Sequence, residues 1–152
     1  MSDVTTVRLA APSYIASVRR HTTFARLPSE IRGYYDVIYA AIRSGKIAKG
    51  GHNVAIYRNA SRRGVDVECG VQVAAPFAAV GEIECREMPT GEAATTVHWG
   101  PYDRLGEAHD RVVAWIRANG RELAGVGWEL YGDWDDDPKK VRTDVFHLLK
   151  PR

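Results

Sequence analysis

Two segments decide the fold: Val97-His98-Trp99-Gly100-Pro101-Tyr102 and, after one predicted helix, Gly127-Trp128-Glu129-Leu130-Tyr131. The first ends a strand in a Gly-Pro turn, and the second has the composition of a buried strand. Within it a single carboxylate, Glu129, lies between aromatic side chains. A buried carboxylate is costly unless hydrogen-bond donors or a cation compensate it. Glu129 is therefore either a ligand-binding residue or a hydrated residue on an exposed face, and alternation alone leaves both open.

Successive side chains of a strand point to opposite faces of its sheet, which sorts this second segment into two sets. Gly127, Glu129 and Tyr131 share one face, whereas Trp128 and Leu130 share the other. We expect Trp128 and Leu130 to pack against the helices, and Glu129 and Tyr131 to point away from them. This is a sharp prediction: if Glu129 and Tyr131 both face the helices and not the groove, the pocket hypothesis loses its central residue.

The second half of the chain has the order strand, helix, strand, strand. We predict strands over 93–99, 127–131 and 141–149, and a helix that follows the turn at 100–103 and ends at Asn119-Gly120. The apolar stripe of this helix is Leu105, Ala108, Val112, Trp115 and Ile116.

The first half repeats the same order. Strands are predicted over 14–18, 53–57 and 65–73, with a helix from Pro28 to a C-terminal cap at Gly45. Two further strand candidates, 4–9 and 82–88, open the first and the second half respectively. We therefore predict a single domain, residues 1–152, made of two pseudo-repeats at about 1–75 and 82–150.

The predicted fold class is α+β: a tandem βαββ repeat that forms a curved antiparallel sheet, with two helices on one face and a ligand groove between the halves. When the halves are aligned, Tyr57 matches Tyr131 and Ala55 matches Glu129. One half thus supplies a carboxylate where the other supplies only a methyl group.

The composition is that of an ordinary globular protein, with 152 residues, 45% hydrophobic and 26% charged. A net charge of +2, with scattered basic residues, argues against direct DNA binding. No apolar run is long enough for a membrane span, and no signal peptide is evident, so we expect a cytoplasmic protein. Cys69 and Cys85 show no metal or redox spacing. The five histidines show no ligand spacing, so we expect no metal and no cofactor.

Two further positions have alternative interpretations. His98 or Trp99 could reach the groove, but a histidine beside a turn is also a common capping residue. Glu68 precedes Cys69-Gly70, and a glycine inside a strand indicates the close approach of a ligand or backbone, or else a bulge or bend in the sheet. The acidic residues of the loop 132–140 lack the glycine and glutamate spacing of a calcium loop and are expected to be solvated.

At these residues the chain resembles the GyrI-like superfamily of small-molecule-binding domains. The resemblance rests on His98-Trp99-Gly100-Pro101-Tyr102, on Trp128-Glu129-Leu130-Tyr131 and on Thr143-Asp144-Val145-Phe146, and it covers the chain from about Ser13 to its end. The helix with Trp115-Ile116 and the strand from Glu68 to Val73 also fit. No segment is available for a helix-turn-helix, so a standalone member of the superfamily is expected.

The resemblance implies a groove that binds hydrophobic, often cationic, molecules, with Glu129 as the counter-charge. We assign the ligand contacts to Glu129, Tyr131, Tyr57, Trp99, His98, Tyr102, Glu68 and Phe146. Some standalone members are similar to hydrolases that open a strained cyclopropane, and then Glu129 and Tyr131 would be catalytic. Others are similar to inhibitors of DNA gyrase, so a protein-interaction role with gyrase as the partner is a third hypothesis.

Overall fold

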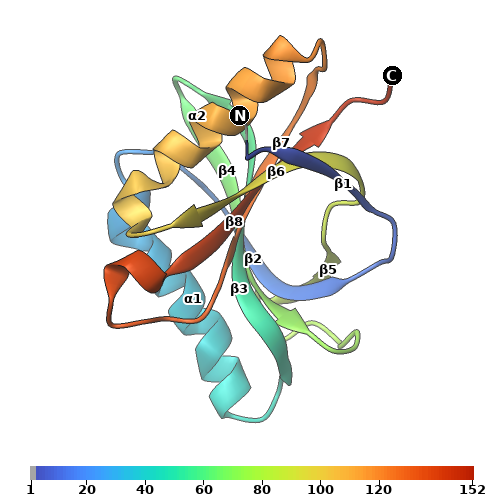
Figure 1. Cartoon of the computed structure of the whole chain (residues 1–152). Helices are drawn as coiled ribbons and strands as arrows, with labels where there is room; N and C mark the ends of the chain where they lie inside the picture. The colour runs from blue at the N-terminus through green and yellow to red at the C-terminus, as the bar shows by residue number, and fades with distance from the viewer. Residues whose placement is uncertain (1–2) are drawn as a thin grey trace. The chain divides into compact units, whose positions relative to one another are not determined.

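The computed structural model describes residues 3–152 and divides the chain into two compact units (Figure 1). Unit 1 comprises residues 1–11 and 89–152, and unit 2 comprises residues 12–88. Within the described residues each unit has four antiparallel strands and one long helix, which confirms the α+β class. No helix in this part of the chain is long and apolar enough to span a membrane.

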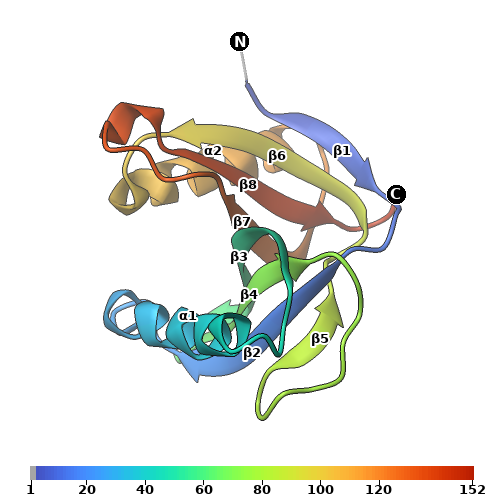
Figure 2. The same cartoon turned by 90° about the horizontal axis from the view of Figure 1, so that it is seen from below.

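Unit 2 contains β2 (Tyr14–Thr22), α1 (Leu27–Arg43), β3 (Lys49–Ser61), β4 (Gly64–Val73) and β5 (Glu84–Glu87). The strands lie in the order β3-β4-β2-β5, and each neighbouring pair is antiparallel. Figure 2 shows α1 along one face of this unit. The opposite face of the strands carries the buried Glu68.

The helix α1 forms where the sequence predicts it. Pro28 occupies its first turn, where the missing amide proton costs nothing, and Gly45 follows its end with a φ of 80° that favours glycine. The helix packs on the odd-numbered side chains of β4 and the even-numbered ones of β2. The buried core between them contains Ile38, Ala41, Ala16, Val18, Val67, Cys69, Val71 and Ile47.

Unit 1 contains β1 (Thr5–Leu9), β6 (Gly91–Trp99), α2 (Leu105–Ala118), β7 (Leu123–Tyr131) and β8 (Arg142–Leu149). The strands lie in the order β1-β6-β8-β7, again antiparallel. A short 3-10 turn, η1 (Tyr102–Arg104), leads into α2, and a second, η2 (Pro138–Lys140), precedes β8.

The predicted apolar stripe of α2 is the side that the helix buries. Leu105, Ala108, Val112 and Ile116 are all at most 6% exposed, and Trp115 packs partly against them. They meet Ala94 of β6 and Val145 and Leu149 of β8. Each large aliphatic side chain buried in this way contributes about 1.5–3 kcal/mol, so this stripe holds α2 on its sheet.

The two opening strands pair differently from the expectation. β1 pairs with β6, from Thr5 opposite Thr95 to Leu9 opposite Gly91, and so belongs to unit 1. β5 pairs with β2 and belongs to unit 2. Each strand thus joins the half that we did not assign to it. Local composition identifies a strand, whereas its partner is decided by which sheet edge is available, and that information is not local.

Candidate functional site

Glu129 is buried beneath α2 and held by two side chains. It is 6% exposed, and its Oε2 lies 2.6 Å from Nε2 of His109, a residue of α2. Its Oε1 accepts a hydrogen bond from the Tyr131 hydroxyl at 2.5 Å, and Tyr131 itself packs on the core under α2. Both side chains therefore face the helix, and the prediction that they point away from it is wrong.

The structure confirms which side chains of β7 share a face, but the face that meets α2 is the one that carries Glu129, not the one that carries Trp128. Trp128 is only 1% exposed although it lies on the side away from α2, and its ring stacks on Phe146 at 5.1 Å with an interplanar angle of 6°. The large apolar side chain of Trp128 predicts packing against a helix, which is why the two faces of β7 are exchanged in the prediction. Phe146, predicted to contact the ligand together with Glu129, lies on the opposite face of the sheet.

A second histidine extends the hydrogen-bonded chain. Nε2 of His147, on β8, lies 2.8 Å from Nδ1 of His109, and the two rings meet edge to face at 5.0 Å. An ionised Glu129 can only accept, so His109 must donate to it from Nε2–H. Nδ1 of a neutral His109 is then an acceptor, which requires the Nε2–H of His147 as its donor. Two donors in sequence, His147 and His109, thus point toward one carboxylate, and Tyr131 donates to its other oxygen.

The environment of His147 keeps it in the neutral form that this chain requires. Burial, and next the neighbouring His109, lower the pKa of His147 to about 4, although Glu129 acts in the opposite direction. The ring lies against Gly127 of β7, where an added Cβ would be 2.7 Å from a ring carbon. Glycine at that position therefore makes room for the histidine.

A row of aromatic rings leads from the surface to Glu129. Trp134, 70% exposed, lies 6.3 Å from the ring of Tyr102 in η1. Tyr102 in turn meets Tyr131 edge to face at 5.5 Å, and Tyr131 donates to Glu129. Partial burial raises the pKa of Tyr102, so its hydroxyl remains neutral at pH 7. We call Trp134, Tyr102 and Tyr131 the aromatic row.

His98 and Trp99 end β6 on opposite faces, as the alternation predicts. His98 is 7% exposed and its Nε2 lies 3.0 Å from the Pro101 carbonyl oxygen, so the side chain closes the turn into η1. Trp99 is exposed, with the Arg142 guanidinium 5.7 Å above its ring. Both line a hollow of about 760 Å³ near Arg104. Glu129 is not among the residues that line it.

Tyr57 and Glu68 lie on opposite faces of unit 2. Tyr57 packs on the core beneath α1, with its ring 6.4 Å from that of Phe24. Glu68 is 1% exposed on the other face, where it bonds to Ser17 and Arg58. One ligand cannot contact both residues from a single face of this sheet.

Three residues near Glu129 were not predicted from the sequence: His109, His147 and Trp134. His109 follows Leu105 by four residues, so it borders the buried stripe of α2, and His147 alternates with the core residues Val145 and Leu149. Those spacings could have placed both histidines beneath the helix. Nothing in the acidic loop marks Trp134. Within residues 3–152 no group of three or more histidine, cysteine or acidic side chains is arranged to hold a metal ion.

Comparison with known proteins identifies the family. Residues 11–150 match the profile of the GyrI-like small molecule binding domain. The chain belongs to this family. A comparison with curated protein sequences gives no significant match. The resemblance read from the sequence is thereby confirmed, and with it the general function of binding a small molecule.

Solved structures share the fold at low sequence identity. The EcmrR C-terminal domain superposes with a TM-score of 0.79 and 19% identity, over 98% of this chain and 96% of that one. SAV2435, solved bound to tetraphenylphosphonium, gives 0.68 and 11%, over 97% and 93%. A hydrolase from Listeria innocua gives 0.62 and 9%, over 97% and 92%. In an EcmrR–DNA complex the matching region is 59% of the longer chain.

Proposed function

We propose that this GyrI-like domain binds hydrophobic organic cations on the aromatic row, with Glu129 as their counter-charge. The observation that carries the proposal is the continuity of the row: Trp134, Tyr102 and Tyr131 connect an exposed surface to a buried carboxylate. The negative faces of aromatic rings attract cations, and a carboxylate adds a directional charge at the buried end.

The hydrogen bonds to Glu129 serve this function. The hydrogen bonds from Tyr131 and His109 fix the Glu129 side chain in one rotamer. A cation that reaches Tyr131 then meets an oriented negative charge in a poorly hydrated setting, where Coulomb attraction is stronger than in water. Preorganisation of this kind lowers the entropic cost of binding.

Tetraphenylphosphonium, the ligand of SAV2435 in its structure, supplies a suitable probe. We expect quenching of tryptophan fluorescence on titration with this cation, with saturation. Glu129→Gln keeps the shape and removes the charge, and should weaken binding by about tenfold or more, roughly 1.4 kcal/mol. Trp134→Ala removes an exposed ring and should weaken binding about threefold to tenfold without affecting folding.

Two controls make the titration decisive. Tetraphenylborate has the same shape and the opposite charge, so it should bind more weakly than the phosphonium to the native protein. Glu122→Gln removes an exposed carboxylate that pairs with Lys150, and should leave affinity unchanged. Equal affinity for both ions, or indifference to Glu129→Gln, would refute the cation site.

A hydrolase is a second candidate, favoured by the His147–His109–Glu129 chain. Each histidine of this chain can both donate and accept a hydrogen bond, so a proton can pass along it between His147 and Glu129 and back. On a strained cyclopropane conjugated to a carbonyl, water would bond to a ring carbon. The ring bond would break with its electron pair passing to the carbonyl system, which would take up the proton that the water loses.

Mass spectrometry distinguishes this activity from binding alone. Incubation with a cyclopropane-bearing electrophile should yield a product heavier by one water, and His109→Gln should slow its formation more than it weakens tetraphenylphosphonium binding. If the native protein and a heat-denatured sample form product at the same rate, the protein is a binder and not a hydrolase.

A further inference from the structure

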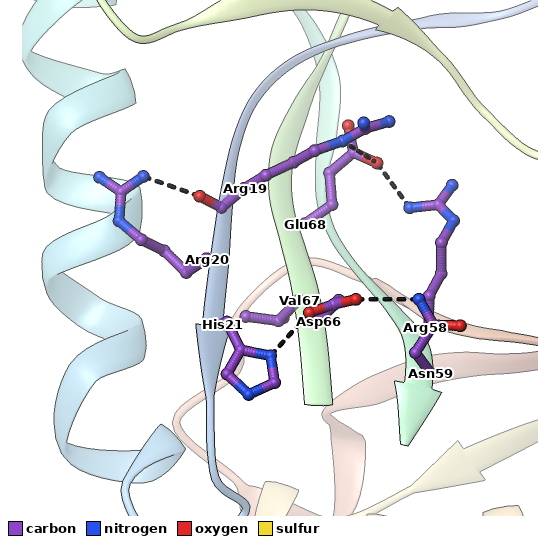
Figure 3. A pocket seen from close by; sticks show the side chains of 8 residues that line it. All are labelled: Arg19, Arg20, His21, Arg58, Asn59, Asp66, Val67 and Glu68. Carbon is purple, nitrogen blue, oxygen red and sulfur yellow. Dashed lines mark hydrogen bonds and ion pairs between the residues drawn. The ribbon is translucent and has the colours of Figure 1, made fainter. Parts of the chain in front are cut away.

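The face of unit 2 opposite α1 carries a charged hollow that the cation site does not use. It has a volume of about 520 Å³, and Arg19, Arg58 and Glu68 form one of its ends (Figure 3). The sheet register explains why they meet. Arg19 of β2 pairs directly with Glu68 of β4, and Arg58 of β3 lies diagonally across from the same residue.

Both carboxylate oxygens of Glu68 accept hydrogen bonds from residues other than Arg19. Its Oε1 accepts from Nη1 of Arg58 at 2.8 Å, and its Oε2 accepts from the Ser17 hydroxyl at 2.6 Å. One guanidinium therefore balances the charge of the buried carboxylate, and both of its oxygens have donors. Arg86 is a further guanidinium nearby, 3.8 Å from Oε2, but it also pairs with Glu84.

Arg19 adds a positive charge that this cluster does not need. Its Nε lies 3.6 Å from Oε1 of Glu68, beyond good hydrogen-bond distance, and its side chain is 60% exposed. Arg19 and Arg58 thus converge on one carboxylate oxygen and together exceed its charge by one. Two like charges held this close repel each other, and a bound anion would relieve the repulsion.

The other end of the hollow bounds the site. Asp66 there is held by Nδ1 of His21 at 2.7 Å and by Nδ2 of Asn59 at 2.9 Å. The hydrogen bond from Asn59, and next that from His21, hold the pKa of Asp66 below its usual range, so it stays charged. Its negative charge confines an anion to the end formed by Arg19 and Arg58. Arg20 contributes little there, because it bonds to Glu82.

We infer that unit 2 binds a small oxyanion, carrying phosphate or carboxylate groups, between the guanidinium groups of Arg19 and Arg58 above Glu68. A guanidinium offers several N–H groups in one plane, which match the spacing of two oxygens of a phosphate or carboxylate. Glu68 is a positioning residue in this site, because it fixes the rotamer of Arg58 from the buried side. The site does not depend on the cation site proposed for unit 1.

Isothermal titration with inorganic pyrophosphate, and separately with citrate, tests the inference on the full chain. We expect saturable binding of one anion per chain. Arg19→Gln should weaken it by about tenfold, since the variant loses a charge-assisted hydrogen bond. Because Arg19 is mostly exposed and not needed by Glu68, this variant should fold normally. Arg58→Gln should weaken binding at least as much, although it also leaves Glu68 less compensated.

The control is Arg117→Gln, which removes an exposed positive charge from the last turn of α2. It should change affinity less than twofold. Amide chemical shifts should move in β2 and β4 around Arg19 and Glu68. If pyrophosphate alone binds, the ligand carries phosphate, and if citrate alone binds, it carries carboxylates. If neither saturates, or if Arg117→Gln weakens binding as much as Arg19→Gln, the site does not exist.

Discussion

His147 makes the stability of this protein depend on pH. Its pKa is lowered from 6.5 to about 4 in the folded state, so between these values the unfolded chain binds a proton that the native state does not. The contribution of His147 to stability is therefore complete above pH 6.5 and is lost as the pH falls toward 4. The difference corresponds to at most about 3 kcal/mol.

Urea unfolding at pH 7 and pH 4.5 measures this effect. We expect the loss of stability on acidification to be clearly smaller in His147→Gln than in the native protein, because the titrating group is gone. His52→Gln removes an exposed histidine and should retain the native pH dependence. If all three proteins lose the same free energy of unfolding between pH 7 and pH 4.5, the His147 ring is not protected from protonation.

Thr143 is a position where a polar group weakens the protein. Within residues 3–152, its fully buried Oγ1 lies without a hydrogen-bond partner. Thr143→Val keeps the shape and removes the hydroxyl, so we expect the free energy of unfolding to rise by about 1 kcal/mol. Thr22→Val is the contrast, since Thr22 donates to Glu30, and it should lower stability. A destabilised Thr143→Val protein would indicate that the hydroxyl is satisfied in solution.

For Glu129, the sequence predicts that the carboxylate needs compensation but does not predict which residues supply it. The sequence indicated that an acid between aromatic residues needs compensation, and the structure bears out that need. The compensation comes from His109 on a helix and from Tyr131 two residues away, and not from an external group alone. A contact between β7 and α2 depends on how the helix rotates over the sheet, which no local pattern specifies.

Replacement of a glycine by alanine should change stability in opposite directions in helix α1 and in strand β7. Gly33 lies on the exposed side of α1, and an added Cβ there would meet nothing within 4 Å. Gly33→Ala should therefore stabilise the protein by about 0.5–1 kcal/mol, since alanine loses less entropy in a helix. Thermal unfolding measures the gain, and a neutral or lower melting temperature would contradict it.

Gly127→Ala should instead destabilise, because its Cβ would lie 2.7 Å from the ring of His147. The ring must move, which breaks its hydrogen bond to His109. We expect a loss of about 1–3 kcal/mol and weaker tetraphenylphosphonium binding. Gly106→Ala, with no atom near the added Cβ, is the matched control. If Gly127→Ala has native stability, His147 is free to shift without cost.

The elements themselves were largely predictable. Pro28 and Gly45 mark the ends of α1, and the stripe from Leu105 to Ile116 identifies the buried side of α2. These signals succeed because capping and helical periodicity are local. The face of β7 was not predictable in the same way, since Trp128 satisfies its apolar requirement by stacking on Phe146 from a different strand.

At the level of the whole chain, the repeat was read correctly but its opening strands were exchanged. A pattern of strand, helix, strand, strand recurs because each half must cover one sheet face with one helix. β1 and β5 lie at sheet edges, and an edge strand can join any free edge that the connecting segment can reach. Their partners therefore became visible only in the structure.

Because β1 pairs with β6, unit 1 and not unit 2 should depend on the first residues of the chain. Removal of residues 1–9 takes away β1, which covers the edge of β6 from Thr95 to Gly91, and also Val4 from the core of unit 1. Amide hydrogen exchange should accelerate in β6, whereas β3 and β4 of unit 2 should keep native protection, although unit 2 begins at Pro12, close to the deleted segment. Removal of residues 151–152, which are exposed, is the control. Accelerated exchange in β2 and β4 with β6 unaffected would show that the first strand belongs, as sequence order suggests, to the first half.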